Sequence, residues 1–428
     1  MLDEKVSRKL KRGVWIYFFL LIFEGALRKW VLPSLAEPLL IIRDPVAIWM
    51  LFMAFKYNLY KPNSYVLLMW AVTVLAFSLA LITGHGNIQV ALFGLRITAI
   101  HFPLIFLIGN IFNKDDVLSL GKIVLWINIG MTLLVAVQFY SPQSAFVNRG
   151  IGGDLEGSGF GGAAGFYRVP GTFSFTNGLA FFYGLAAAYI FYFWIATNPN
   201  KNFKILLILS TMALMAAIPL SISRTVLFQI LLTFVFMLII SGINLRIIPK
   251  IVIAVLAVGL MFTTMKDIAF FKTANNAFTE RFTSANKTEG GMEGVFVDRF
   301  LGGMYGALTD ESFPFWGMGM GMGTNAGAKI LTGERSEGVF LVSEGEWGRV
   351  LGEMGVILGF VVIIIRISLV LYLIRKAWGA ISQENVLPWM LLSFGMIIIL
   401  QGQWAQPTNL GFGILIGGLI LASFNQTD

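Results

Sequence analysis

The sequence predicts an all-α polytopic membrane protein with about twelve transmembrane helices, and three observations support this fold class. Hydrophobic residues make up 57% of the 428 residues, and charged residues only 13%. A soluble domain averages about 25% charged residues. Many apolar stretches approach the roughly 20 residues that are needed to cross a bilayer. Short connections, several of them basic, separate these stretches, so we predict one integral membrane domain over residues 1–428.

Each apolar stretch is interpreted as one span. The predicted spans are 14–30, 34–55, 65–84, 89–111, 117–140, 174–196, 203–221, 224–241, 246–264, 347–374, 387–401 and 408–424. Two long segments fall on the same predicted side: the glycine-rich loop 141–173, and the large polar loop 265–346 between the ninth and tenth spans. No internal repeat is evident, whereas many transporters are built from inverted repeats.

The basic connections set the predicted orientation. Cytoplasmic loops of membrane proteins carry an excess of lysine and arginine. We therefore place the basic connections and both termini in the cytoplasm, and the two long loops on the outer, periplasmic side. The basic connections are Lys5 to Arg12, Lys56 and Lys61, Lys114 and Lys122, Lys201 and Lys204, Arg246 and Lys250, and Arg375 and Lys376.

A second group of basic residues lies on the predicted outer side, where this rule does not explain it. Ionisable residues near a bilayer are costly and have a partner or a function. One interpretation is local pairing, because Glu24 precedes Arg28 by four residues and Asp44 adjoins Arg43. Collectively, the group favours a site for a phospholipid or a lipid-linked pyrophosphate, since guanidinium groups suit phosphates. Its members are Arg28, Lys29, Arg43, Arg96, Arg149, Arg168, Arg224, Arg281, Arg299, Arg335 and Arg349.

Metal and nucleotide sites are not expected. The chain has no cysteine and only two histidines, His85 and His101, which argues against zinc or copper. We expect His101 to be a packed polar group. Carboxylate-bound Mg²⁺ or Ca²⁺ stays open, although the outer loops have no DxD-like cluster. The run WGMGMGMGTNAG, 316–327, lacks a following GK[ST] and a βαβ context, so we predict a tight turn. We predict no cofactor, no metal and no nucleic-acid partner.

Two junctions between spans carry an arginine. In FYRVPGTFSFTNG, Arg168 precedes a Pro-Gly turn, and Ser174 and Thr176 are interpreted as caps of the sixth span. In SISRT, Arg224 stands where two spans meet. This second motif is read either as a hydrogen-bonded turn or as a contact to a lipid phosphate.

The stretch SEGEWGRVLGEMG, beginning at residue 343, crowds charges at the start of the tenth span. Ser343 and Glu346 match a capping box, which predicts that Glu346 bonds back to the Ser343 N–H. Glu346, Arg349 and Glu353 share one helical face, so we expect Glu353 to neutralise Arg349. Neither of these structural roles accounts for Glu344. Its alternative explanation is that an acidic residue in the first turn is favoured by the helix dipole.

The layout resembles the O-antigen ligase and O-antigen polymerase (Wzy-like) membrane glycosyltransferases. The resemblance is densest from residue 281 to residue 359, in DRFLGGMYGALTDESFPFWGMGMG and EGEWGRVLGEMGVILG. Arg299 falls on the family's loop arginine, the glycines at 317, 319 and 321 on its G-x-G turn, and Glu353 and Gly355 on its E-x-G. Glu344 stands where the ligases have a histidine. This departure favours a polymerase-like or a divergent member of the family.

The resemblance implies a glycan transfer from a polyprenyl pyrophosphate carrier, such as undecaprenyl pyrophosphate, to an acceptor hydroxyl. The reaction would take place at the outer face of the bacterial cytoplasmic (inner) membrane, in polysaccharide biosynthesis of the cell envelope. The implied partners are the lipid-linked glycan, the bilayer and a chain-length-regulating membrane protein.

The expected site combines a base with a cationic clamp. We nominate Glu344 as the general base, Glu346 as its fallback and Arg299 as a catalytic arginine. The pyrophosphate clamp would comprise Arg168, Arg224, Arg96, Arg28, Arg43 and Arg349. The rival interpretation is a lipid-linked oligosaccharide flippase or another polytopic transporter, which predicts paired halves, broken helices at the midplane and charges spread over both leaflets. A scaffold without activity is a third interpretation.

Overall fold

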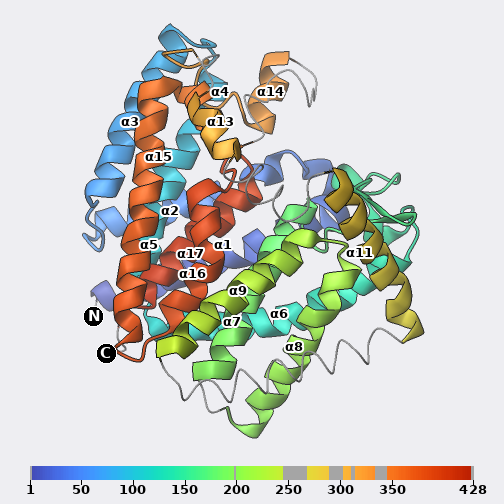
Figure 1. Cartoon of the computed structure of the whole chain (residues 1–428). Helices are drawn as coiled ribbons and strands as arrows, with labels where there is room; N and C mark the ends of the chain where they lie inside the picture. The colour runs from blue at the N-terminus through green and yellow to red at the C-terminus, as the bar shows by residue number, and fades with distance from the viewer. Residues whose placement is uncertain are drawn as a thin grey trace.

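The computed structural model describes residues 2–196, 199–243, 268–288, 302–309, 314–332 and 345–425. These residues form a bundle of helices with one short hairpin, so the all-α fold class is confirmed for the described residues (Figure 1). The α-helices are α1 (Leu2–Ala26), α2 (Asp44–Lys56), α3 (Ser64–Ile82), α4 (Ile88–Leu95), α5 (Phe102–Ile111), α6 (Lys114–Tyr140), α7 (Thr176–Ala196), α8 (Lys201–Leu220), α9 (Arg224–Ile243), α11 (Ala269–Thr288), α13 (Gly303–Thr309), α14 (Asn325–Thr332), α15 (Glu346–Ile381), α16 (Leu387–Gln401) and α17 (Pro407–Ala422).

Shorter elements connect these helices. They are the π-helical turns η1 (Leu27–Val31) and η4 (Arg96–His101), the 3₁₀ turns η2 (Pro33–Leu35), η3 (Pro38–Ile41), η5 (Phe146–Asn148) and η6 (Ile151–Gly153), and the antiparallel strands β1 (Gly161–Ala163) and β2 (Phe166–Tyr167).

Within the described residues, seven helical segments are long and apolar enough to cross a membrane. They are Pro38–Lys56, Ser64–Ile82, Ile88–Ile111, Lys114–Tyr140, Thr176–Ala196, Lys201–Leu220 and Glu346–Ile381. Shorter apolar helices cover Arg224–Ile240, Leu387–Gln401 and Pro407–Ala422. The predicted first span, 14–30, falls on α1 and η1, which are not among the seven, and the predicted span 246–264 lies outside the described residues. The number twelve therefore stays a prediction.

Asparagine side chains begin four of the helices. Asn63, Asn87, Asn113 and Asn200 precede α3, α4, α6 and α8, and each side-chain oxygen accepts a hydrogen bond from a backbone N–H two or three residues later. Such caps satisfy donors that have no partner inside the helix. Four helix starts are thus encoded locally.

The helix α15 is not one straight rod. Gly355 has φ 78° and ψ 170°, which is non-helical and divides α15 into two helical arms. In a straight helix, twenty residues span about 30 Å, yet Arg366 Nη1 lies 2.5 Å from Glu346 Oε1. The first arm, 346–354, therefore folds back on the second, 356–381. The predicted continuous span 347–374 is wrong in this respect, because only the second arm continues along the bundle.

One end of the bundle, called the basic end below, carries both chain termini (Figure 1). Lys11 Nζ lies 2.5 Å from Asp116 Oδ2, and the Lys114 N–H donates to Asn425 O over 3.3 Å. The N-terminal helix, the start of α6 and the end of α17 therefore meet there. This arrangement agrees with the placement of the two termini on one side, while the side of the membrane stays a prediction.

The opposite end carries the glycine-rich loop 141–173 and the described parts of the large loop 265–346. α6 leaves the basic end at its start and reaches this opposite end at Tyr140. α11 packs along α8 and β1, α13 against α15, and α14 against α4 (Figure 1). The described pieces of both predicted outer loops thus lie against the bundle.

Close helix packing in the centre depends on small residues. α17 packs against α5 and α16, and α7 packs against α9 and α16. A Cβ atom on Gly109 would come within 2.6 Å of Leu421 Cβ, and one on Gly418 within 2.6 Å of Ile108 Cβ. Small residues allow helices inside a membrane to approach closely, so glycines on both helices set the distance between α5 and α17.

Candidate functional site

Three arginines from distant parts of the sequence, at the end opposite the chain termini, lie near enough that the charges of two of them act on the third. Arg168 follows β2, Arg224 begins α9, and Arg281 lies in α11; all three are half-buried. Partial burial and the positive charges of Arg281 and Arg224 lower the pKa of Arg168. We call these residues the three-arginine cluster.

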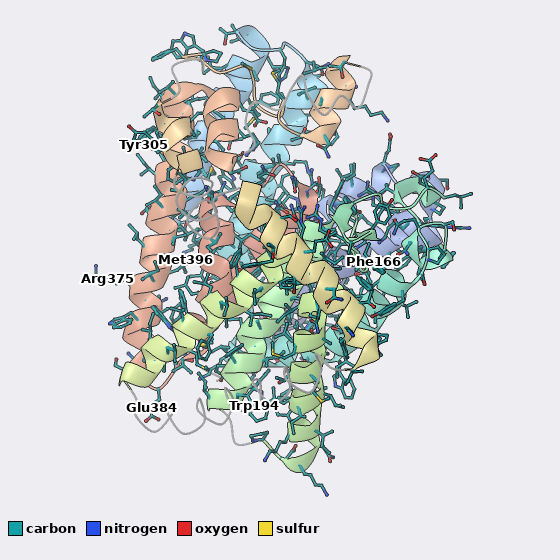
Figure 2. The ribbon with its side chains drawn as sticks, turned by 45° about the vertical axis from the view of Figure 1, so that its right-hand side comes forward. Phe166, Trp194, Tyr305, Arg375, Glu384 and Met396 are labelled. Carbon is teal, nitrogen blue, oxygen red and sulfur yellow. The ribbon has the colours of Figure 1, made fainter. Side chains whose placement is uncertain are left out.

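The hairpin positions the first member of the cluster. The Arg168 N–H donates to Phe160 O over 3.0 Å, and its Nε donates to Gly161 O over 2.8 Å. Phe166, which is labelled in Figure 2, belongs to the hairpin. Its ring stacks on Phe139 with 4.7 Å between ring centroids, which fixes the hairpin on the end of α6. Among the described residues, no hydrogen bond reaches the two Nη groups of Arg168. They are available to an incoming acceptor.

Helical periodicity positions Arg281. Ala274 and Ala277 are fully buried on the inner face of α11, and Arg281 follows Ala274 by seven residues, which places it on the same face. Phe282 lies 6.4 Å from Phe228 between ring centroids. Because Phe228 is one turn after Arg224 on α9, this ring contact brings Arg224 towards Arg281.

The cluster is suited to a multiply charged anion. Like charges that are held close together in a partly buried place repel one another, and a bound anion relieves the repulsion. Guanidinium groups form charge-assisted hydrogen bonds to phosphate oxygens. The sequence predicted Arg168 and Arg224 as members of such a site, whereas it placed Arg281 only in the wider group of outer basic residues. The sequence signal for Arg281 was its position seven residues after Ala274, which puts it on the apolar face of α11.

Arg28, Arg43 and Arg96 are instead bound to carboxylates in the interior. Glu24 Oε1 lies 3.6 Å from Arg28 Nη1, and Glu24 Oε2 lies 3.4 Å from Arg43 Nε. Arg96 donates to both oxygens of Asp44, over 2.6 and 2.9 Å. All five side chains are almost fully buried. The pairing of Arg28 with Glu24 follows the predicted four-residue spacing.

The pairing expected between Arg43 and Asp44 is wrong. Adjacent side chains on a helix point in different directions, so Asp44 pairs with Arg96, and Arg43 reaches Glu24 and donates to Pro407 O over 2.5 Å. Two buried carboxylates, Glu24 and Asp44, thus hold these three arginines in the interior. We therefore remove Arg28, Arg43 and Arg96 from the clamp.

His101 is a packed polar group, as expected. Its side chain is fully buried, with Nε2 at 2.9 Å from Asp44 Oδ1 and Nδ1 at 3.0 Å from the Tyr17 hydroxyl. The residue thus extends the ion pair between Asp44 and Arg96.

Lys29 fastens the glycine-rich loop to the first helix. Its Nζ donates to Gly171 O over 2.7 Å and to Phe173 O over 2.8 Å. Next to it, Arg28 donates to Ser174 Oγ over 2.8 Å. The interpretation of Ser174 as a helix cap is therefore replaced by a contact to Arg28, and α7 begins at Thr176. These contacts join residues more than 140 positions apart, so the spacing of residues in the sequence could not predict them.

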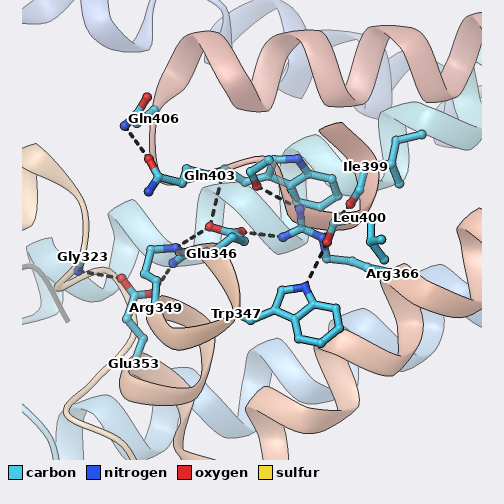
Figure 3. Close-up of polar contacts among 12 residues, drawn as sticks. Gly323, Glu346, Trp347, Arg349, Glu353, Arg366, Ile399, Leu400, Gln403 and Gln406 are labelled. Carbon is cyan, nitrogen blue, oxygen red and sulfur yellow. Dashed lines mark hydrogen bonds and ion pairs between the residues drawn. The ribbon is translucent and has the colours of Figure 1, made fainter. Parts of the chain in front are cut away.

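Glu346 is the centre of a buried ion network in α15 (Figure 3). Its carboxylate accepts hydrogen bonds from Arg349 Nε and Nη2, over 2.8 and 2.9 Å, from Arg366 Nη1 over 2.5 Å and from the Trp404 N–H over 3.2 Å. α15 begins at Glu346 itself, with Gly345 preceding it. The capping box is therefore wrong for Glu346, because a carboxylate between two guanidinium groups gains more than one bonded to a backbone N–H.

The remaining charges of this stretch complete the network. Arg349 Nη1 lies 2.6 Å from Glu353 Oε2, so the predicted neutralisation of Arg349 is confirmed. Glu353 Oε1 also accepts the Gly323 N–H over 2.6 Å. The four buried side chains, Glu346, Arg349, Glu353 and Arg366, have two negative and two positive charges. We therefore assign Glu346 and Arg349 to this structural network. Glu346 is removed as the fallback base, and Arg349 is removed from the pyrophosphate clamp. Arg366 was not identified from the sequence as a member of the network. A single arginine within an apolar run is itself a signal of a buried partner.

The glycine run 316–323 makes the tight turn that was predicted. Gly317, Gly319 and Gly321 have φ values of 77°, 118° and 94°, a region that favours glycine. The Met318 N–H donates to Gly352 O over 2.7 Å, and the Gly319 N–H to Glu353 O over 3.0 Å. The turn thus packs directly on the first arm of α15.

Two predicted site residues, Arg299 and Glu344, lie outside the described residues, as do Ser343 and Arg335. In the part of the chain that the structure describes, no group of three or more histidine, aspartate or glutamate side chains could hold a metal ion. No protein-family model and no curated protein matches this chain. The resemblance to O-antigen ligases and polymerases therefore rests on the motifs quoted above.

Proposed function

We propose that this chain is a membrane glycosyltransferase that moves a glycan from a polyprenyl-pyrophosphate carrier to an acceptor hydroxyl, polymerase-like rather than ligase-like. The observation that carries the proposal is the three-arginine cluster. It brings together one arginine just after β2, one at the start of α9 and one in α11, the last two beside the contact between Phe228 and Phe282. In this proposal, the chain has twelve spans, the basic end faces the cytoplasm, and the cluster faces the periplasm.

The cluster would bind and stabilise the leaving pyrophosphate. The acceptor oxygen attacks the anomeric carbon of the donor glycan, and the bond from that carbon to the pyrophosphate oxygen breaks. Negative charge develops on the pyrophosphate, where fixed cations stabilise the transition state. The proton of the acceptor hydroxyl passes to a general base, for which Glu344 stays our nominee. Arg299 stays the nominee for a further contact to the leaving group.

The proposed clamp differs from the one expected from sequence. It keeps Arg168 and Arg224 and adds Arg281. Arginines that neutralise buried carboxylates, such as Arg96 on Asp44, are left out because a second anion would have to compete with the first. The half-buried members of the cluster are the better supported ligands for a substrate.

An assay with a lipid-linked oligosaccharide tests the proposal. The purified chain is reconstituted in liposomes, and both chain extension and release of the pyrophosphate carrier are measured. We expect Arg168→Ala and Arg281→Ala each to lower the rate about 100-fold, the typical loss for one transition-state contact. Arg375→Ala is the matched control, since this exposed arginine lies at the basic end of α15.

Two outcomes would contradict the proposal, the first its assignment of the cluster and the second the enzyme itself. Full activity of Arg281→Ala would remove the cluster from the reaction. Movement of the oligosaccharide across the bilayer without a new glycosidic bond would identify a flippase, for which the same arginines would bind the cargo.

A further inference from the structure

A polar pocket lies at the basic end of the bundle, at the other end of the helices from the three-arginine cluster. Its volume is about 420 Å³, and the ends of α3, α5, α15 and α17 surround it. The carboxy-terminal end of the described chain closes one side, because Asn425 Nδ2 donates to Gly109 O over 2.6 Å and to Phe112 O over 2.9 Å. These bonds occupy the carbonyl groups at the end of α5.

The charge of the pocket is positive. Lys61 and Lys376 both line it, and none of its lining residues is acidic. Lys376 Nζ lies 4.5 Å from the centre of the Phe424 ring, which holds the ammonium group at the rim. The first turn of the 19-residue helix α3, at Ser64, also lines the pocket. Its N–H groups add partial positive charge, as at other anion-binding helix starts.

A buried hydroxyl in this pocket has no partner among the described residues. Tyr60 lines the pocket with an exposed fraction of 4%, and its hydroxyl makes no hydrogen bond. Burial raises the pKa of Tyr60, so the group remains a neutral O–H donor. A buried polar group without a partner is costly. An acceptor oxygen in the pocket would remove that cost.

The rest of the lining is apolar. Phe106 and Leu421 line the pocket, and Tyr65 stacks on Phe106 with 5.8 Å between ring centroids. The α3 segment and the segment that ends in α5 are both long and apolar enough to cross a membrane. The pocket thus joins basic groups at helix ends to apolar surface along the helices, the combination found in a phospholipid between its headgroup and its acyl chains.

We propose that this pocket binds the phosphate headgroup of an anionic phospholipid, with Lys61, Lys376 and the Tyr60 hydroxyl as its ligands. The lipid would fill the space between α3, α5, α15 and α17 and stabilise their ends. The site does not depend on the proposed transfer reaction, since it lies at the other end of the bundle and shares no residue with the three-arginine cluster.

Native mass spectrometry of the full chain in a neutral detergent tests this site. The protein is titrated with phosphatidylglycerol and with phosphatidylcholine of the same acyl chains. We expect tighter binding of phosphatidylglycerol, and a loss of about tenfold in that affinity for the double variant Lys61→Gln/Lys376→Gln, because each basic residue near a lipid surface contributes to binding. The matched control is Lys201→Gln/Lys204→Gln, which removes the same charge from exposed positions at the start of α8.

Two further measurements separate the possible ligands and roles. Tyr60→Phe keeps the ring and should weaken phosphatidylglycerol binding several-fold without lowering thermal stability. Inorganic phosphate is added as a competitor, and we expect it to leave the lipid bound even in large excess. Equal binding of the two lipids, or equal losses in both double variants, would overturn the proposal. Displacement of the lipid by inorganic phosphate at similar concentration would assign the pocket to a free anion instead.

Discussion

Arg366 donates a 2.5 Å hydrogen bond to Glu346, although twenty residues separate them along α15. The contact exists because the chain folds back at Gly355, whose φ of 78° and ψ of 170° are essentially restricted to glycine. The E-x-G segment therefore has a structural role. Glu353 neutralises Arg349, and Gly355 makes the turn between the two arms.

Replacing Gly355 by alanine should disrupt this fold-back. A Cβ atom there would lie 2.3 Å from Phe315 O, in addition to the unfavourable φ. We expect a loss of more than about 2 kcal/mol in the free energy of unfolding, measured by thermal denaturation in detergent. Gly379→Ala in the same helix is the control, because nothing lies within 4 Å of its Cβ position. Equal melting temperatures for the two variants would contradict the assigned turn.

Glu346→Gln should destabilise the protein. The substitution removes one negative charge between two buried guanidinium groups, and breaking a buried ion pair costs about 3–5 kcal/mol. Thermal unfolding measures the effect, with the exposed Glu384→Gln as control. A Glu346→Gln variant of normal stability that had lost glycan transfer would instead restore Glu346 as a candidate base.

Arg281→Gln should affect stability and ligand binding in opposite directions. Removing one of three neighbouring positive charges relieves repulsion, so the ligand-free protein should gain about 0.5 kcal/mol. The same change should reduce the stabilisation by added polyprenyl pyrophosphate. Melting temperatures with and without the lipid check both effects. A variant that loses stability without lipid would indicate a structural role for Arg281.

Lys29→Met should loosen the glycine-rich loop. The variant loses the two hydrogen bonds to Gly171 O and Phe173 O. Leaving buried carbonyl groups without a charged donor should cost about 2 kcal/mol. Amide hydrogen exchange of residues 141–173 should become faster, while exchange in α16 stays unchanged. Unaltered exchange in the loop would show that Lys29 does not hold it.

Local features of the chain were readable from the sequence. Apolar stretches predicted most of the described helices, because a helix that is buried or faces lipid needs apolar residues on all sides. The pairs Glu24–Arg28 and Arg349–Glu353 were predicted, since residues four apart are neighbours on any helix. The glycine run 316–323 was predicted to turn tightly, because glycine adopts positive φ at little cost.

The partners of the other charged residues were decided only by the tertiary structure. Arg43 pairs with Glu24 and not with the adjacent Asp44. Arg366 pairs with Glu346 because the chain turns at one glycine between them. Arg281 lies near Arg168 and Arg224, which come from two other segments. A buried charge takes the partner that folding places nearest in space, and distance along the chain does not set that partner. The sequence by itself therefore determined a helical, membrane-type protein with an excess of arginines. The packing of its helices decided which residues lie next to each arginine, because side chains from distant segments meet only in the folded chain.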